Sequence, residues 1–364
     1  MALIITFLGK GGTGRTTLAI ASARQLAQQG KRVLLTTQDA SPAFSMLLGK
    51  TVGTDPTEIA PNFQALQFKS AQLLESSWEE LKTLEAQYVR TPFFKNVYGQ
   101  ELGVLPGMDS ALALNAIRQY EAGDQYDVII YDGIASPDVL RMLGMPEILS
   151  WYLRRFRQVF LDSDFWKSLS PFVQPVASTV LSVDISANNF SQPTNQASNM
   201  LDQGTAAVAD PNRVVAYLVT TSDPAAVATA HYLWGCAQQV GLTVGGALLN
   251  QAETTPELSA TFAPLGLSLI PQRSGDDWQS LTAALPDFQQ ASNLPKPITI
   301  DAAQSQVTLF LPGFDKKQIK LTQYGPEVTI EAGDQRRNIL LPDSLRGKPV
   351  TGAKFQENHL TISF

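Results

Sequence analysis

The sequence predicts an α/β protein with a doubly wound, mostly parallel sheet and a helical insert, followed by a small C-terminal β-sandwich. Three observations carry this prediction. Short apolar runs alternate with helix-patterned segments over most of the chain, a stretch rich in Leu, Phe and Trp interrupts the alternation, and strand-like segments take over after Pro297. The 364 residues are enough for two domains. We expect the α/β domain over residues 1–292 and the β-sandwich over residues 296–364.

The first strand, helix and strand form a clear βαβ unit. Leu3–Leu8 is a continuous apolar run, typical of a buried parallel strand, and glycines follow it directly. Thr16–Gln29 carries apolar residues on one face and stops at Gly30, as a helix does, and Lys31–Thr37 is the next apolar run. Further strands are predicted at 62–68, 127–132, 214–220 and 243–250, with helices at 72–88 and 225–241.

Too much chain separates the strand ending at Asp132 from the strand starting at Val214 for one crossover. We therefore expect a helical subdomain, roughly over residues 70–120 and 146–205. Residues 188–204 are polar and rich in Asn, Gln and Ser, a composition that favours a mobile loop.

The chain after Pro297 has the pattern of an all-β domain, with Pro, Gly and Asp turns between short strands. A sandwich of this size shields only part of its apolar surface, so the remainder should lie against the α/β body or a partner. The predicted strands are 298–300, 306–311, 319–322, 327–331, 337–341 and 359–364.

Composition excludes several classes of protein. The net charge of −6 and the absence of a basic tail argue against nucleic acid as the partner, and no apolar stretch is long enough to cross a membrane. One cysteine, Cys236, forms neither an internal disulfide nor a Cys-x-x-Cys zinc site, which favours a reducing compartment. We expect a cytoplasmic protein without stable membrane insertion.

Residues 9–17, called the phosphate loop below, read Gly-Lys-Gly-Gly-Thr-Gly-Arg-Thr-Thr. They fit G-x-x-x-x-G-K-[ST] except that Arg15 stands in the lysine position. The glycines allow backbone N–H groups to converge on phosphate oxygens at the start of a helix, and Thr16 offers a hydroxyl to Mg²⁺. The alternative is a glycine-rich turn without a ligand.

Lys10 makes this loop similar to the deviant P-loop of the ATPases that include MinD, ParA, ArsA and the tail-anchored-protein targeting ATPase, and further segments narrow the resemblance to the last two. Residues 37–49 resemble the switch I segment S-T-D-P-A-H-S-L-x-x-x-x-G, and residues 132–146 resemble switch II. Residues 106–109 resemble the family's P-G-x-D-E, and residues 245–251 resemble the strand whose Asn meets adenine. The resemblance covers roughly residues 1–290.

The resemblance implies a cytosolic homodimeric ATPase that uses ATP and Mg²⁺ and handles hydrophobic segments of membrane proteins. Asp39 would orient the attacking water, Lys10 would reach the partner subunit's nucleotide, and Asn250 would read adenine. Thr16 and Asp132 would hold the metal. The implied phosphate-binding residues are Gly11, Gly12, Thr13, Gly14, Arg15, Thr16 and Thr17.

Departures from the family pattern leave a second hypothesis open. Arg15 is not equivalent to lysine, and both switch segments have lost family residues, so the chain could instead be a nucleotide-binding scaffold that barely hydrolyses ATP. Asp39 as a helix cap and Asp132 as a surface charge are the structural alternatives. With one cysteine, an arsenite-pump subunit is disfavoured and zinc bridging is not expected.

Two other segments are candidates for client binding. An apolar stripe between Phe156 and Val173 occupies the position of the family's client groove, but such a stripe is equally expected in a core. Residues 311–320 and 353–364 resemble the α-crystallin domain of small heat-shock proteins. That resemblance implies either client holding or docking on the ATPase body.

Overall fold

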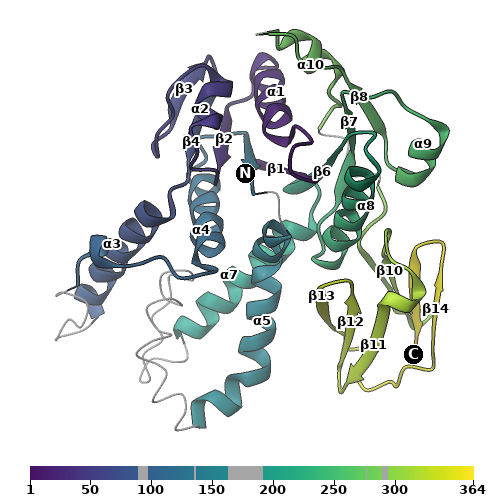
Figure 1. Cartoon of the computed structure of the whole chain (residues 1–364). Coiled ribbons are helices and arrows are strands. Elements are labelled where there is room, and N and C mark those ends of the chain that lie inside the picture. Colours follow the sequence, from purple (N-terminus) through teal and green to yellow (C-terminus); the bar gives the residue numbers. More distant parts are fainter. Residues whose placement is uncertain (89–96, 135–136, 163–191, 276, 289–293) are drawn as a thin grey trace.

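The computed structural model describes residues 1–88, 97–134, 137–162, 192–275, 277–288 and 294–364. An eight-stranded sheet in the order β3-β4-β2-β5-β1-β6-β7-β8 forms its centre (Figure 1). Only the edge strand β3 runs antiparallel to its neighbour. The strands are β1 (Leu3–Leu8), β2 (Val33–Thr37), β3 (Thr57–Ala60), β4 (Phe63–Gln67), β5 (Val128–Asp132), β6 (Val214–Thr220), β7 (Val244–Asn250) and β8 (Leu267–Ile270).

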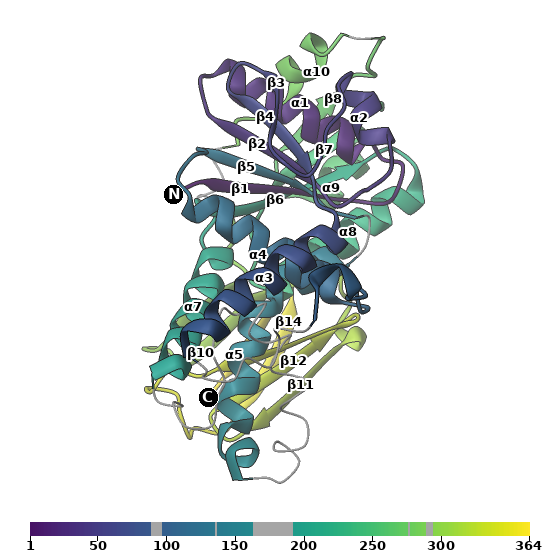
Figure 2. The same cartoon turned by 90° about the vertical axis from the view of Figure 1, so that its left-hand side faces the viewer.

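Helices cover both faces of this sheet, which is why its central strands are mostly apolar (Figure 2). One face packs against α1 (Arg15–Gln28), α2 (Ala43–Leu48) and α10 (Gln279–Ala284). The other face packs against α4 (Met108–Ala122), α5 (Asp138–Asp162), α7 (Gln192–Ala209) and α8 (Pro224–Gln239). Two more helices are α3 (Ser70–Tyr88) and α9 (Pro256–Phe262).

The C-terminal strands form two small antiparallel sheets, so the predicted fold class is confirmed. One sheet has the order β14-β15-β10-β9 and the other the order β11-β12-β13. The strands are β9 (Ile298–Asp301), β10 (Gln306–Phe310), β11 (Ile319–Tyr324), β12 (Glu327–Ala332), β13 (Gln335–Leu340), β14 (Gly352–Gln356) and β15 (His359–Ser363). Strand β14 was not predicted, because its side chains are mostly exposed and show no apolar alternation.

The prediction of a mobile loop over residues 188–204 is wrong for the part that the structure describes, because α7 begins at Gln192. The polar composition of α7 obscures, in the sequence pattern, a narrow apolar face of this helix. Leu201 and Val208 are buried against the core, and Gly204 approaches Pro146 of α5 so closely that an added β-carbon would lie 3.0 Å from the proline Cγ. Burial of that face against α5 stabilises a helix whose composition alone resembles a linker.

The sandwich and the α/β domain share one continuous hydrophobic core. Trp234 of α8 packs edge-on against Phe310 of β10, with ring centroids 5.4 Å apart, and Tyr232 packs similarly against Phe314 at 5.8 Å. Gly235 leaves no space for a side chain, since a β-carbon there would lie 2.1 Å from the Pro312 carbonyl oxygen. The sandwich therefore lies against the α/β body, which is one of the two alternatives that its small size left open.

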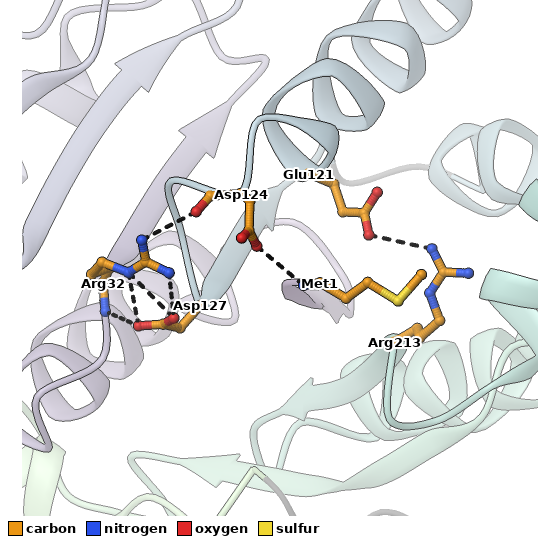
Figure 3. Close-up of polar contacts among 6 residues, drawn as sticks. All are labelled: Met1, Arg32, Glu121, Asp124, Asp127 and Arg213. Carbon is orange, nitrogen blue, oxygen red and sulfur yellow. Dashed lines mark hydrogen bonds and ion pairs between the residues drawn. The ribbon is translucent and has the colours of Figure 1, made fainter.

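Ion pairs gather at the amino ends of the central strands (Figure 3). Asp127, just before β5, accepts hydrogen bonds from the Arg32 backbone N–H at 2.8 Å and from its guanidinium at 2.8 Å. Arg213, just before β6, pairs with Glu121 at 3.3 Å. These contacts join neighbouring strand starts and leave the opposite edge of the sheet to the phosphate loop.

No helix in the described ranges is long and apolar enough to cross a membrane.

Candidate functional site

The phosphate loop lies at the carboxyl end of β1 and leads directly into α1. Gly12 and Gly14 have φ angles of 84° and 92°, a left-handed conformation that side chains other than glycine adopt with strain. Between them Thr13 closes a tight turn, with its hydroxyl donating to the Lys10 carbonyl at 2.9 Å. Left-handed glycines in such a loop allow backbone N–H groups to face a bound anion at the start of a fourteen-residue helix, and the Thr13 N–H itself donates to the Lys10 carbonyl at 3.3 Å. This is the geometry that binds phosphate groups.

Asn250, at the end of β7, supports this loop. Its side-chain amide donates to the Thr13 carbonyl at 2.8 Å, and the residue is 4% exposed. A β-carbon on Gly14 would lie 2.3 Å from Asn250 Nδ2. The residue predicted to read adenine is therefore bonded to the loop backbone in this structure.

A shallow cavity of about 370 Å³ adjoins Asn250. Gln251, Ala252 and Glu253 line one side, and residues 269–272, following and ending β8, line the other. Its walls are mainly apolar, as suits the flat face of a nucleobase.

Arg15 and Thr16 point from the start of α1 toward the end of β5. Thr16 Oγ1 donates to Asp132 Oδ2 at 2.8 Å, and Arg15 Nη1 donates to the Gly133 carbonyl at 3.0 Å. Burial lowers the pKa of Arg15, and the nearby charge of Asp132 opposes that change. Arg15 therefore contacts the start of switch II. The loop pattern, in which lysine stands at this position, did not predict that contact.

Asp132 is 3% exposed, so it is not the surface charge of the alternative interpretation. Burial raises its pKa, while the hydrogen bond from Thr16 and the charge of Arg15 act in the opposite direction. Its Oδ1 atom is buried and has no hydrogen-bond partner among the described residues. A carboxylate oxygen with unused acceptor capacity beside a threonine hydroxyl fits Mg²⁺, which binds proteins through few ligands and keeps water or phosphate oxygens on the rest.

Asp39, the predicted water-orienting residue, is exposed and bonded locally. Its Oδ1 accepts from the Ser41 backbone N–H and its Oδ2 from the Ser41 hydroxyl, both at 2.9 Å. This arrangement closes a turn before α2, but Asp39 does not cap that helix, because the N-cap residue is Pro42, which makes no side-chain hydrogen bond to the first turn. Its charge is near enough to contribute to the raised pKa of Asp132.

Two glutamines that the sequence interpretation missed hold the backbone around Asp39. Gln67, at the end of β4 and 5% exposed, donates from Nε2 to the carbonyls of Asp39 and Ser41, both at 3.0 Å. Gln38 donates to the Asp109 carbonyl at 3.0 Å and accepts from the Tyr131 hydroxyl. A polar residue closing a buried strand at the sheet's carboxyl edge was the available signal for Gln67.

The remaining predicted residues lie along the same loop. Lys10, Gly11 and Gly12 are exposed at its tip, and Thr17 lies within the first turn of α1. The Lys10 ammonium has no hydrogen-bond or ion-pair partner in the part of the chain that the structure describes. The structure thus brings Arg15, Thr16, Asp132 and Asn250 together around the loop, whereas Lys10 lies apart from them at its exposed tip.

Two further features of the sequence concern zinc and client binding. Cys236 is fully buried in α8, as expected for a small hydrophobic residue, and the described residues contain no cluster of three or more His, Cys, Asp or Glu suited to a metal. The side chains of the apolar stripe between Phe156 and Val173 lie outside the described residues.

A mostly parallel sheet with a phosphate loop after its first strand, a buried aspartate at the end of β5 and an asparagine at the end of β7 defines a P-loop ATPase. The family model described as "Anion-transporting ATPase" matches residues 2–260, and the chain belongs to this family, that of ArsA. A second model, for the HSP20-like domain found in ArsA, matches residues 302–364. The suspected resemblance is therefore confirmed for both parts of the chain.

Three relatives are similar to this chain at low sequence identity. An uncharacterized protein of Streptomyces coelicolor is 27% identical, covering 100% of this chain and 96% of its own length. A putative arsenical pump-driving ATPase of Prosthecochloris vibrioformis is 24% identical, covering 99% and 95%. ATPase GET3 of Malassezia globosa is 27% identical over 46% of this chain and 47% of its own length.

Proposed function

We propose that this chain binds ATP with Mg²⁺ at the phosphate loop and hydrolyses it as a homodimer that handles hydrophobic protein segments. The loop geometry carries the proposal: two glycines with left-handed backbone open a fourteen-residue helix opposite a buried aspartate with a free oxygen. The similarity to ATPase GET3 and to pump-driving ATPases supports an ATP-dependent activity of this class.

The proposed roles follow from where the side chains lie. Backbone N–H groups of residues 11–17 and the Arg15 guanidinium would bind phosphate oxygens, and the cavity beside Asn250 would take the base. Thr16 and Asp132 would hold Mg²⁺, which when bound neutralises charge on the phosphates. Asp39 would turn away from Ser41 to position water, and Lys10 would reach the nucleotide of the second subunit.

Two contacts favour the alternative, a nucleotide-binding scaffold that hydrolyses slowly. Arg15 is bonded to the Gly133 carbonyl, and Asp39 is bonded twice to Ser41. Asp39 would have to leave Ser41 before it could position water, and the bond from Arg15 Nη1 to Gly133 would hold the guanidinium back from the phosphates. A turnover assay with Asp39→Asn as the control separates the two candidates, because only a hydrolysing enzyme loses measurable phosphate release.

Nucleotide binding itself is tested by thermal unfolding. Millimolar Mg·ATP should raise the melting temperature of the wild-type chain, because a ligand that binds only the folded state stabilises it. Gly14→Val should abolish this shift, since its β-carbon meets both the strained backbone and Asn250.

Gly30→Ala is the matched control for this variant. Gly30 also has a positive φ, 83°, but a β-carbon there meets no atom within 4 Å. It should lower stability through backbone strain and keep the Mg·ATP shift. A wild-type melting temperature that does not respond to Mg·ATP would contradict the proposed function.

A further inference from the structure

The hairpin of β12 and β13 reaches between the two helices that face the sandwich. At its turn, Gly333 has a φ of 60°, and a β-carbon there would lie 2.8 Å from Phe314 and 2.9 Å from Tyr232 of α8. The backbone N–H of Asp334 donates to the Tyr232 hydroxyl at 3.3 Å. The hairpin turn is therefore closely packed against α8, with no space for a larger residue.

The same hairpin contacts α5 at three points along one side of that helix. Arg141 pairs with Asp334, Glu147 pairs with Arg337 at 3.2 Å, and Trp151 Nε1 donates to Glu327 at 2.9 Å. These α5 residues occupy successive turns of the helix, and their partners belong to β12, to β13 and to the turn between them. The Arg337 side chain is 10% exposed and also donates to the Gln238 carbonyl of α8.

The first turn of α5, a helix that the hairpin also contacts further along, lies next to a residue that binds the phosphate loop. Gly133 follows β5, and its α-carbon lies against α5, because a β-carbon there would be 2.5 Å from Val139 Cγ2. Val139 is 2% exposed in the first turn of α5. Gly133 also supplies the carbonyl that accepts from Arg15. A displacement of the first turns of α5 therefore displaces the acceptor that holds the Arg15 guanidinium.

We propose that the β12–β13 hairpin holds α5 in the position in which Gly133 retains Arg15, so that docking of the sandwich opposes nucleotide binding. This inference rests on the proposed binding of Mg·ATP. Binding of a triphosphate would draw the Arg15 guanidinium toward the phosphate loop, and the bond from its Nη1 to Gly133 would oppose that movement. The two arrangements compete, and whatever stabilises the first weakens the second by the same factor.

The test removes hairpin charges that lie at the surface and measures Mg·ATP affinity by titration calorimetry on the full chain. Asp334→Asn removes an ion-pair partner whose side chain is 77% exposed, so the fold should survive. We expect the dissociation constant for Mg·ATP to fall about two- to fourfold, a modest factor because exposed pairs are weak. Asp334→Asn combined with Glu327→Gln should lower it further, to about five- to tenfold below wild type.

Asp343→Asn is the matched control. It makes the same change at a carboxylate that pairs with Arg346, also in the sandwich, and among the described residues no hydrogen bond or ion pair joins it to α5 or α8. Its affinity for Mg·ATP should equal that of the wild type.

Reciprocal linkage gives a second measurement that needs no variant. Saturating Mg·ATP should speed amide hydrogen exchange in β12, β13 and the first turns of α5. Unchanged or weaker affinity in both hairpin variants, or slower exchange there, overturns the inference while leaving the proposed function intact. A wild-type chain that does not bind Mg·ATP overturns both.

Discussion

Side-chain amides and guanidinium groups at the carboxyl edge of the sheet bind backbone carbonyls of the neighbouring loops. Asn250 holds Thr13, Gln67 holds Asp39 and Ser41, and Arg15 holds Gly133. Each donor is buried or half-buried, so leaving it without an acceptor would be costly. The loops around the candidate nucleotide site are thus held by donors from other strands and helices of the domain.

At the amino edge, Asp127 gives a pH-dependent prediction. Hydrogen bonds and the charge of Arg32 lower its pKa from 3.8 to about 2, so the folded state favours the carboxylate. The stabilisation is complete above the unfolded pKa and is lost as the pH falls through the folded one. Asp127→Asn should therefore lower the melting temperature at pH 7, and the difference from wild type should shrink between pH 4 and pH 2.

Differential scanning calorimetry across that pH range measures the effect. Asp343→Asn changes an ion pair at a carboxylate that is 87% exposed and should shift the melting temperature little at any pH. A difference between wild type and Asp127→Asn that stays constant down to pH 2 would show that the ion pair is not its source.

Among the elements, the strands that are buried on both faces could be predicted closely from sequence. Leu3–Leu8 and Val214–Thr220 are the strands β1 and β6 without any change of bounds. β3, β8 and β14 were missed because they lie at sheet edges, where few side chains are buried and the apolar signal is weak. α7 was missed because its partner α5, and not its composition, stabilises it.

The candidate site, too, could be predicted from sequence only in part. Local sequence predicted the loop and the positions of Thr16 and Asp132, because each follows or ends a recognisable strand. It could not predict that Arg15 contacts Gly133 or that Gln67 holds switch I, since these pairs join segments that only the folded sheet brings together.

The contact between α8 and β10 predicts a large effect on stability. Trp234 is 1% exposed, so Trp234→Ala should leave a cavity and lower the free energy of unfolding by about 3–5 kcal/mol. Tyr324→Ala removes another large ring at a position that is 61% exposed and should change it by no more than about 0.5 kcal/mol.

Urea unfolding followed by circular dichroism compares the two variants. A loss below about 1 kcal/mol for Trp234→Ala would mean that the sandwich does not pack against α8 in solution.

At the scale of the whole molecule, one core extends from the central sheet through α8 into the sandwich. The phosphate loop, by contrast, places its exposed tip and Lys10 at the surface. A lysine there would serve a second subunit's nucleotide better than its own, because Arg15 already lies beside the loop of the same chain. The assembly is thus expected to form through the loop edge and not through the sandwich.

We expect light scattering to show a two-fold dimer in the presence of Mg·ATP. Lys10→Ala should weaken this dimer, whereas a zinc-selective chelator in excess Mg²⁺ should leave it unchanged. A strict monomer with Mg·ATP present, or dissociation by the chelator, would argue against this assembly.

The shared core also sets an order for folding during synthesis. Trp234 emerges from the ribosome long before β15, which completes the sheet that covers it and ends at Ser363. At roughly 5 to 20 residues per second, the intervening 129 residues take about 6 to 26 s to translate. During that interval the nascent chain presents the aromatic face of α8 to water, and chaperones that bind exposed aromatic surface would meet it there first.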